Sequence, residues 1–186
     1  MTEIMSKLKH AGFTLVELIT TIAVASILLS LAVPGVRNFT MNARQAGSIN
    51  EFVSAMHLAR NTAITTNSRV TVCASAGGNT CEATTWNQGW LVFIDDNSDQ
   101  AVDPGERVLG AGEGSSALDI DSAQFGRFFM YRPNGRVMNA VVTTNTGEFT
   151  ICDERGPGHA RVVIVDISGR PRLSTVKANG AAPSCS

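Results

Sequence analysis

Residues 12–18 read Gly12-Phe13-Thr14-Leu15-Val16-Glu17-Leu18, and an almost unbroken apolar run follows as far as Val33, just before Pro34. The 21 residues from Phe13 to Val33 contain one charged side chain, the carboxylate of Glu17. A helix of this length spans roughly 30 Å, the thickness of a bilayer core. A carboxylate at the centre of a bilayer costs roughly 2.5–3.5 kcal/mol on insertion scales. The sequence therefore predicts a membrane-spanning helix in which Glu17 has a function and a partner.

The short polar segment before the apolar run indicates where that partner could come from. The segment ends with three basic or titratable residues: Lys7, Lys9 and His10. An ordinary secretory signal is cleaved after its apolar region at small residues, but no convincing site follows this run. Cleavage after Gly12 would instead leave a free, positive amine on Phe13, four residues before Glu17. The amine of a neighbouring subunit could then neutralise Glu17 in the membrane or in a helical assembly.

The segment from Gly12 to Glu17, with its basic leader and Pro34, resembles the class III signal of type IV pilins and type II secretion pseudopilins. In that family a prepilin peptidase cuts after the glycine and methylates the new N-terminal phenylalanine. The glutamate at the fifth mature position recruits and registers subunits in the filament. The resemblance implies processing between Gly12 and Phe13, assembly through Glu17, and two kinds of partner: the prepilin peptidase and other pilin or pseudopilin subunits. The alternative is a plain N-terminal membrane anchor with an incidental glutamate.

Composition divides the chain into four parts. We expect a prepilin leader peptide at residues 1–12, a transmembrane and polymerisation helix at 13–34, the amphipathic half of the same helix at 35–68, and a periplasmic β-rich globular domain at 69–186. Apolar residues recur at spacings of three and four beyond Pro34, so this half should pack on the domain and end where Asn67 can cap it. By the positive-inside rule, Lys7 and Lys9 before the helix put the domain on the far side of the membrane. The resemblance implies a single-pass inner-membrane protein with a periplasmic domain, which later assembles into a pilus or pseudopilus.

The globular domain is predicted to consist of short strands separated by turns. Pro133-Asn134-Gly135 and Ser168-Gly169 are the clearest turn signals. The expected strands are residues 69–74, 89–95, 107–109, 127–131, 149–152, 161–167 and 172–176. The predicted fold class is α+β, a pilin-like fold in which a long N-terminal helix packs on a C-terminal antiparallel β-sheet domain.

The chain has four cysteines, Cys73, Cys81, Cys152 and Cys185, and their spacings match no metal-binding pattern. An exported domain lies in an oxidising compartment, so two disulfides are expected, with three alternative pairings. Cys73 with Cys81 would close a local loop, and Cys152 with Cys185 would tie the C-terminal tail to a strand. We favour this pairing, in part because the pilin family often ties its C-terminal region with a disulfide.

A finer resemblance is to the GspH/FimT branch of this family, which contains minor pilins and minor pseudopilins, low-copy subunits near the filament tip. It rests on Trp86, on Gly89-Trp90-Leu91-Val92-Phe93 with the Asp-rich loop after it, and on Gly169-Arg170-Pro171-Arg172. The last segment resembles the G-R-x-R motif that DNA-binding FimT-type pilins use in natural transformation. The resemblance implies that Gly169, Arg170 and Arg172 bind double-stranded DNA.

The residues of this motif suit phosphate binding. Gly169 permits the positive φ of a tight turn, and arginine forks bind phosphates bidentately. Residues 122–186 hold eight basic and four acidic side chains, whereas residues 82–121 hold nine acidic and one basic, so a basic surface is expected in the C-terminal third. Candidate basic neighbours are Arg127, Arg132, Arg136, Arg155, Arg161 and Lys177. Acidic residues that count against binding are Asp153, Glu154 and Asp166. The alternative is a hairpin whose arginines are merely solvated.

The acidic loop after the Gly89–Phe93 segment has some of the ligand spacing of a calcium-binding loop. Asp95, Asn97, Asp99 and Glu106 occupy places 1, 3, 5 and 12 of such a loop, but Gln100 stands where glycine is usual. We therefore favour an acidic surface turn between two strands and predict neither a metal site nor a cofactor.

Enzymatic chemistry has no support in the sequence, which lacks a G-x-S-x-G or P-loop motif, so no catalytic residue is predicted. The leading interpretation is a minor type IV pilin of the FimT type, incorporated into a pilus at its tip, that binds DNA for uptake in natural transformation. The alternative is a minor, GspH-like pseudopilin of a type II secretion system without DNA binding. A membrane-tethered binding module that never polymerises is a third class, but it leaves Glu17 unexplained.

Overall fold

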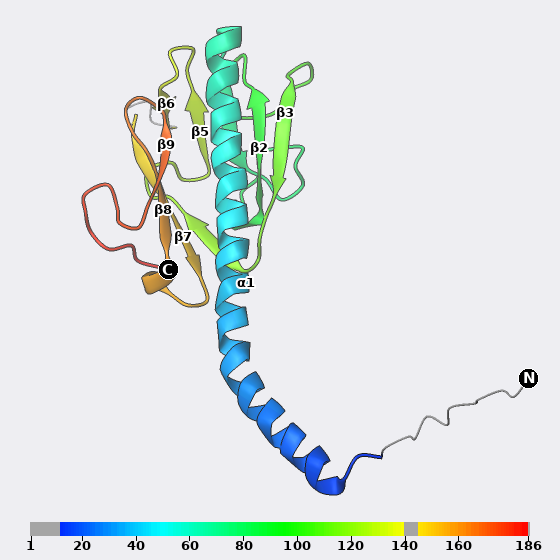
Figure 1. The fold of residues 1–186 in the computed structure, drawn as a ribbon. Helices are drawn as coiled ribbons and strands as arrows, with labels where there is room; N and C mark the ends of the chain where they lie inside the picture. The colour runs from blue at the N-terminus through cyan, green and yellow to red at the C-terminus, as the bar shows by residue number, and fades with distance from the viewer. Residues whose placement is uncertain (1–11, 140–144, 186) are drawn as a thin grey trace, which may run out of the picture. The chain divides into compact units, whose positions relative to one another are not determined.

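The computed structural model describes residues 12–139 and 145–185 (Figure 1). Within these residues one long helix, α1 (Leu15–Thr66), is followed by short antiparallel strands. The chain forms two compact units, Met1–Asn42 and Ala43–Ser186, and every described strand belongs to the second. The chain therefore has the predicted α+β architecture.

The helix packs through a stripe of apolar side chains in its second half. Its buried apolar residues recur at the expected spacing: Ile49, Phe52, Met56, Ala59 and Ala63. The helix ends at Thr66, and Asn67 follows with a φ of 53°, the left-handed conformation in which asparagine commonly ends helices. This confirms the predicted end of the helix.

One polar residue of the helix, Gln45, lies on the buried side among the apolar residues. Gln45 is buried, and its amide Nε2 donates to the carbonyl oxygens of His159 at 3.1 Å and Ile151 at 3.5 Å. A buried amide is tolerated when it is hydrogen-bonded. Gln45 therefore holds the helix against the end of one strand and the loop that follows it.

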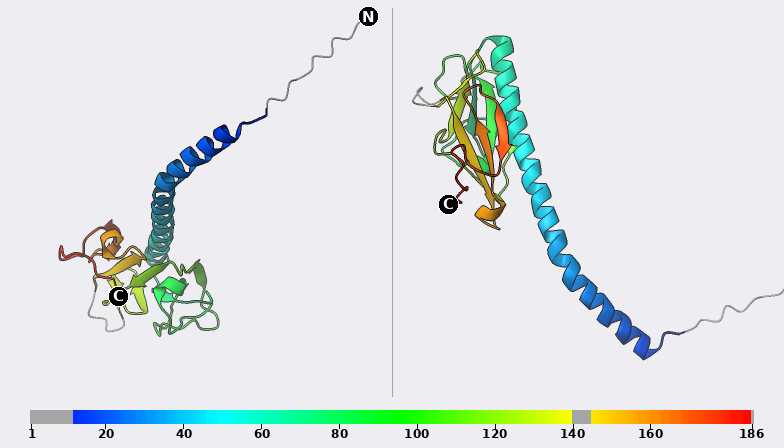
Figure 2. Two further views of the ribbon diagram at one scale, coloured as in Figure 1. Left: turned by 90° about the horizontal axis from the view of Figure 1, so that it is seen from below. Right: turned by 60° about the vertical axis from the view of Figure 1, so that its left-hand side comes forward.

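Nine strands in the described residues form two antiparallel sheets. The first sheet has the order β3-β2-β1-β5-β6 and consists of β1 (Val70–Ala74), β2 (Gly89–Ile94), β3 (Val108–Glu113), β5 (Phe128–Tyr131) and β6 (Val137–Met138). The second has the order β4-β7-β8-β9 and consists of β4 (Leu118–Asp121), β7 (Gly147–Asp153), β8 (Arg161–Val165) and β9 (Pro171–Ser174). Short 3-10 turns lie at Trp86–Gln88 and Pro157–His159. In both views of Figure 2 the two sheets lie on the same side of the second half of α1, which is the half that packs on the strands.

The core joins the helix to both sheets through aromatic rings. The ring of Phe52 lies 4.9 Å from that of Trp90 in the first sheet and 4.9 Å from that of Phe149 in the second, centroid to centroid. Trp86 packs on Phe52 and Phe149, and its indole nitrogen donates to the carbonyl of Gly126 at 2.6 Å. Edge-to-face pairs of this kind add about 0.5–1.5 kcal/mol each beyond their buried area. Phe52 of the helix thus packs against both sheets and sets their arrangement at this point of the core.

Both disulfides are present in the expected pairing. Cys73 is bonded to Cys81, and Cys152 is bonded to Cys185, with Cα–Cα distances of 5.5 Å and 5.9 Å. Cys73 and Cys81 cover the side of the first sheet that faces away from α1, beside Leu91 and Phe93. The other bridge joins the C-terminal segment to β7.

Candidate functional site

The N-terminal motif forms the first turn of α1. Thr14 precedes the helix, and its hydroxyl oxygen accepts a hydrogen bond from the backbone N–H of Glu17 at 3.3 Å. This is the contact of a threonine N-cap, and threonine with glutamate three residues later is the capping-box pattern. Glu17 therefore stands in the first turn, where the helix dipole stabilises a negative charge.

The helix beyond Glu17 presents an apolar surface that nothing in its own unit covers. Large apolar side chains from Phe13 to Phe39 are exposed, Phe13 by 81%. The hydroxyl groups in this stretch donate to backbone carbonyls of the same helix: Thr20, Thr21, Ser26 and Ser30. Among the described helices, α1 is the one that is long and apolar enough to cross a membrane. Such a surface fits lipid or other helices of the same kind. The expected leader, apart from Gly12, lies outside the described residues.

The arginine motif stands on the turn between β8 and β9. Gly169 has a φ of 73°, and its N–H donates to the carbonyl of Asp166 at 2.9 Å. The carboxylate of Asp166 accepts hydrogen bonds from the hydroxyl and the N–H of Ser168, the latter at 2.9 Å. The hydroxyl of Ser168, above all, lowers the pKa of the Asp166 carboxyl below its usual range. Asp166 thus serves as an acceptor that closes this turn.

Two other elements hold the same turn in place. Gly169 lies against the turn between β5 and β6 so closely that a Cβ atom on it would be 2.0 Å from the carbonyl oxygen of Gly135. Arg60 of α1 donates from Nε and Nη2 to the carbonyl of Ser168, at 3.4 Å each. The sequence motifs do not single out Arg60. Its position in the last turns of a helix that packs on strands was the available signal.

Arg170 and Arg172 project from this fixed turn into solvent. Both arginine side chains are exposed, whereas Gly169, in the turn that connects β8 and β9, is buried. Pro171 begins β9 at the edge of the second sheet, and Arg172 pairs with Ile164 of β8. Within residues 12–139 and 145–185, neither guanidinium group donates a hydrogen bond or forms an ion pair. The charge of Asp166 does act on Arg172 across the hairpin. The two arginines are therefore available to an external anion.

The structure places the candidate basic neighbours in three regions of the domain. Arg132 and Arg136 flank the turn that touches Gly169, because the N–H of Arg132 donates to the carbonyl of Arg136 at 2.9 Å. The other strand-end arginines lie at the far ends of their strands: Arg127 before β5, and Arg155 and Arg161 at the end of β7 and the start of β8. Lys177 belongs to the C-terminal segment, with its ammonium nitrogen 3.5 Å from the hydroxyl of Ser184.

Two of the acidic residues expected to oppose anion binding lie away from the arginine turn. Asp153 forms an ion pair with Arg155 at 2.5 Å, and this hydrogen-bonded partner lowers the pKa of the Asp153 carboxyl. Glu154 lies beside them, at the far end of the second sheet. Asp166 alone of the three stands at the arginine turn.

The acidic loop after β2 uses its carboxylates internally. Glu106 accepts from the N–H groups of Asp96 at 2.9 Å and Asp103 at 3.0 Å, and Asp99 accepts from Ala101 at 2.9 Å. Asp95 departs from the expected surface turn, because it is fully buried and accepts from the hydroxyl of Thr71 at 2.6 Å. No group of three or more acidic, histidine or cysteine side chains in the described residues is arranged to hold a metal ion.

Comparison with known proteins gives one fold and one family. Two crystal forms of the type IV minor pilin FimU of Pseudomonas aeruginosa are 19% identical to this chain, with TM-scores of 0.57 and 0.54, and cover 80% and 76% of it and 99% of their own chains. The minor pseudopilin EpsH of the Vibrio cholerae type 2 secretion system is 12% identical, with a TM-score of 0.46, over 68% of this chain and 93% of its own. No curated protein sequence matches significantly.

Two family models match the chain itself. The prokaryotic N-terminal methylation motif matches residues 7–33, which contain Gly12, Phe13 and Glu17. The model of the type II transport protein GspH matches residues 48–169, from the buried stripe of α1 to the glycine of the arginine turn. This second match spans more than half of the chain. The protein therefore belongs to the GspH family and is a minor pilin or pseudopilin of a type IV pilus or a type II secretion system.

Proposed function

We propose that this protein is a minor type IV pilin that binds double-stranded DNA through Arg170 and Arg172, for uptake in natural transformation. The observation that carries the proposal is the pair of exposed guanidinium groups, which have no hydrogen-bond or ion-pair partner among the described residues and stand on a turn that two other elements hold in place. The backbone of this turn is already ordered, so binding a phosphate has to immobilise only the two arginine side chains. Arg132 and Arg136 on the adjoining turn add positive charge to the same end of the domain.

The expected contacts are with phosphates. Two arginines on a tight turn cannot fill a groove with donors that read base edges, so binding should show little sequence preference. The affinity should resemble non-specific DNA binding, with a Kd on the order of 10⁻⁴–10⁻⁶ M near physiological salt. It should fall steeply as salt rises, because each neutralised phosphate releases counterions.

The test is a fluorescence anisotropy titration of a labelled DNA duplex with the full chain in a neutral detergent. We expect salt-sensitive binding by the wild type and loss of most of it in Arg170→Gln/Arg172→Gln. The matched control is Arg44→Gln/Arg127→Gln, which removes the same charge from two exposed arginines. These lie at the other end of the domain, since Gln45 contacts His159 whereas Arg60 contacts Ser168. Absence of salt-sensitive binding, or equal losses in the two double variants, would show the proposal to be wrong.

Processing and assembly follow the family motif in this proposal. The prepilin peptidase cleaves between Gly12 and Phe13 and methylates the new amine, and the domain stays on the periplasmic side of the inner membrane until assembly. In the filament, the amine of Phe13 in one subunit lies near Glu17 of a neighbour. The capped first turn of α1 supports this role, since it orders Glu17 immediately after the cleavage point.

The second candidate is a minor pseudopilin of a type II secretion system that does not bind DNA. It is favoured by the name of the matching family model, and that match ends at Gly169, before the two arginines. The anisotropy titration separates the candidates, because only the first predicts binding that depends on Arg170 and Arg172.

A further inference from the structure

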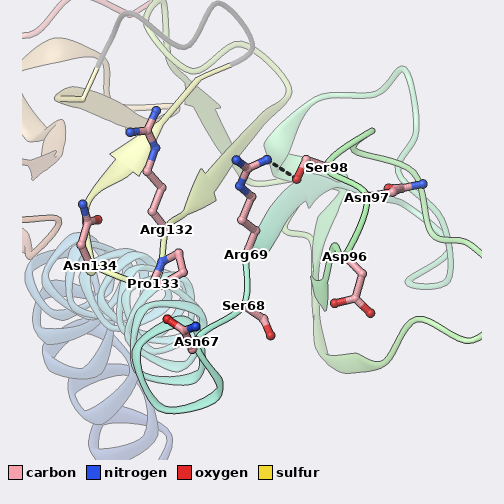
Figure 3. Close-up of a pocket in the computed structure, with 9 residues that line it drawn as sticks. All are labelled: Asn67, Ser68, Arg69, Asp96, Asn97, Ser98, Arg132, Pro133 and Asn134. Carbon is pink, nitrogen blue, oxygen red and sulfur yellow. Dashed lines mark hydrogen bonds between the residues drawn. The ribbon is translucent and has the colours of Figure 1, made fainter.

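Arg69 and Arg132 stand next to each other at the ends of adjacent strands. β1 and β5 pair Val70 with Tyr131, so Arg69 and Arg132 occupy the next position along this antiparallel ladder. Val70 and Tyr131 belong to the core, and side chains alternate along strands, so the two arginines face away from it. Figure 3 shows both guanidinium groups projecting in the same direction. Like charges directly opposite each other in a ladder are destabilising, so this pair suits an anion between them.

The contacts within the protein do not neutralise the pair. Arg69 donates from Nη1 to the hydroxyl of Ser98, and Arg132 donates from Nε to the sulfur of Met138 at 3.0 Å, a weak acceptor. In the part of the chain that the structure describes, neither forms an ion pair with a carboxylate. The buried Asp95 next to Arg69 on β2 accepts from Thr71 instead.

The two arginines line an open groove of about 780 Å³ at this end of the domain. Its other lining groups are mostly neutral hydrogen-bonding side chains, among them Asn67, Ser98 and Asn134. Asp96 is the acidic side chain among the lining residues, and Figure 3 shows its carboxylate directed away from the guanidinium groups. A polar, net positive groove that is open to solvent fits a phosphate of a long chain, which must enter and leave it.

The groove is continuous with the arginine turn of the proposed function. Arg132, Pro133 and Asn134 form one wall of the groove, and Gly135 of the same turn touches Gly169. We propose that the groove between Arg69 and Arg132 binds a second backbone phosphate of the DNA held by Arg170 and Arg172. This inference rests on the proposed DNA binding and extends the DNA path across the β5–β6 turn.

The test measures the salt dependence of DNA binding by the full chain in neutral detergent. The slope of log K against log salt is about −0.9 for each phosphate neutralised, so Arg69→Gln/Arg132→Gln, which removes the contacts to one phosphate, should reduce its magnitude by about 0.9 and weaken binding on the order of tenfold. Arg69→Lys/Arg132→Lys keeps both charges and should retain the slope. The Arg44→Gln/Arg127→Gln control should retain it too, and circular dichroism melting checks that each variant is folded.

The outcomes separate this inference from the proposed function. If Arg170→Gln/Arg172→Gln loses binding but Arg69→Gln/Arg132→Gln keeps the wild-type slope, the groove does not bind phosphate and the proposed function stands. If the Arg44→Gln/Arg127→Gln control reduces the slope equally, the effect is one of net charge and the groove is again excluded. If the wild type shows no salt-sensitive binding, the proposed function fails and the inference fails with it.

Discussion

Gly169 is the residue on which the arginine turn depends. Its φ of 73° is strained for any other residue, by roughly 1–2 kcal/mol, and an added Cβ would collide with the carbonyl oxygen of Gly135 at 2.0 Å. Gly169→Ala should therefore lower the free energy of unfolding by at least about 1–2 kcal/mol, measured by urea denaturation. Gly158→Ala is the matched control, because Gly158 has an ordinary φ and open space around it. Equal stability of the two variants would contradict the close contact between the turns.

Single residues also show which parts of the candidate site could be predicted from the sequence. The motif predicted that Arg170 and Arg172 stand on a glycine turn, because Ser168-Gly169 is a local signal that needs no tertiary information. Arg69 was not found, because its significance comes from the pairing of Val70 with Tyr131, which is 61 positions away along the chain. Asp95 was placed on the surface, because a carboxylate that bonds a threonine of the next strand looks like any loop aspartate in the sequence.

Glu17 belongs to the scale of the helix, because its backbone N–H is capped by the hydroxyl of Thr14 and its carboxylate stands in the first turn. Glu17→Ala should leave membrane insertion intact, since it removes a costly carboxylate, but should impair incorporation into filaments. Immunoblots of sheared pili measure incorporation, and mass spectrometry checks that the mature chain begins with a methylated Phe13. Thr20→Ala is the control, because the hydroxyl of Thr20 donates to the carbonyl of Glu17 in the same helix, at 3.0 Å, and carries no charge. Normal recovery of Glu17→Ala in sheared pili would show that this charge is not needed for assembly.

The disulfide to β7 should stabilise the domain more than the local one. On the chain-entropy model the Cys152–Cys185 bridge, with a separation of 33 residues, contributes about 4 kcal/mol, and the Cys73–Cys81 bridge, with a separation of 8, about 2.5 kcal/mol. Replacing both cysteines of each bridge by serine and comparing urea midpoints tests this order. A larger loss of stability on removing the local bridge would mean that its apolar contacts with Leu91 and Phe93 contribute more than chain entropy.

The helix and those strands that have a strong local sequence signal could be predicted. The remaining strands form because they pair with a neighbouring strand. The helix and all seven expected strands are present, with ends shifted by a few residues. β6 has only two residues, and β4 (Leu118–Asp121) carries two aspartates in four, so neither has a strand signature of its own. Both form because a neighbouring strand supplies hydrogen-bond partners: Met130 and Tyr131 for β6, and residues 150–153 for β4. The division into two sheets likewise depends on the long-range pairing of β1 with β5.

At the scale of the whole molecule, the chain combines an apolar helix with a domain that carries two pairs of arginines close together at one end: Arg69 with Arg132, and Arg170 with Arg172. The arginine turn, the β5–β6 turn and the Arg69–Arg132 groove all lie at the end of the domain where α1 finishes, as the contacts of Arg60 and Gly135 show. A subunit built in this way can be held in a filament through residues 13–34 while the end of its domain remains free to meet an anion.

The most direct test of this account is the retention of sheared pili on immobilised double-stranded DNA at low salt, with the chain followed by immunoblot. The account predicts that wild-type filaments contain the chain, bind the DNA and are released by high salt. Filaments of the Arg170→Gln/Arg172→Gln variant should contain the same amount of the chain but should not be retained. The account is contradicted if the chain is absent from sheared pili, or if the variant filaments are retained as well as the wild type.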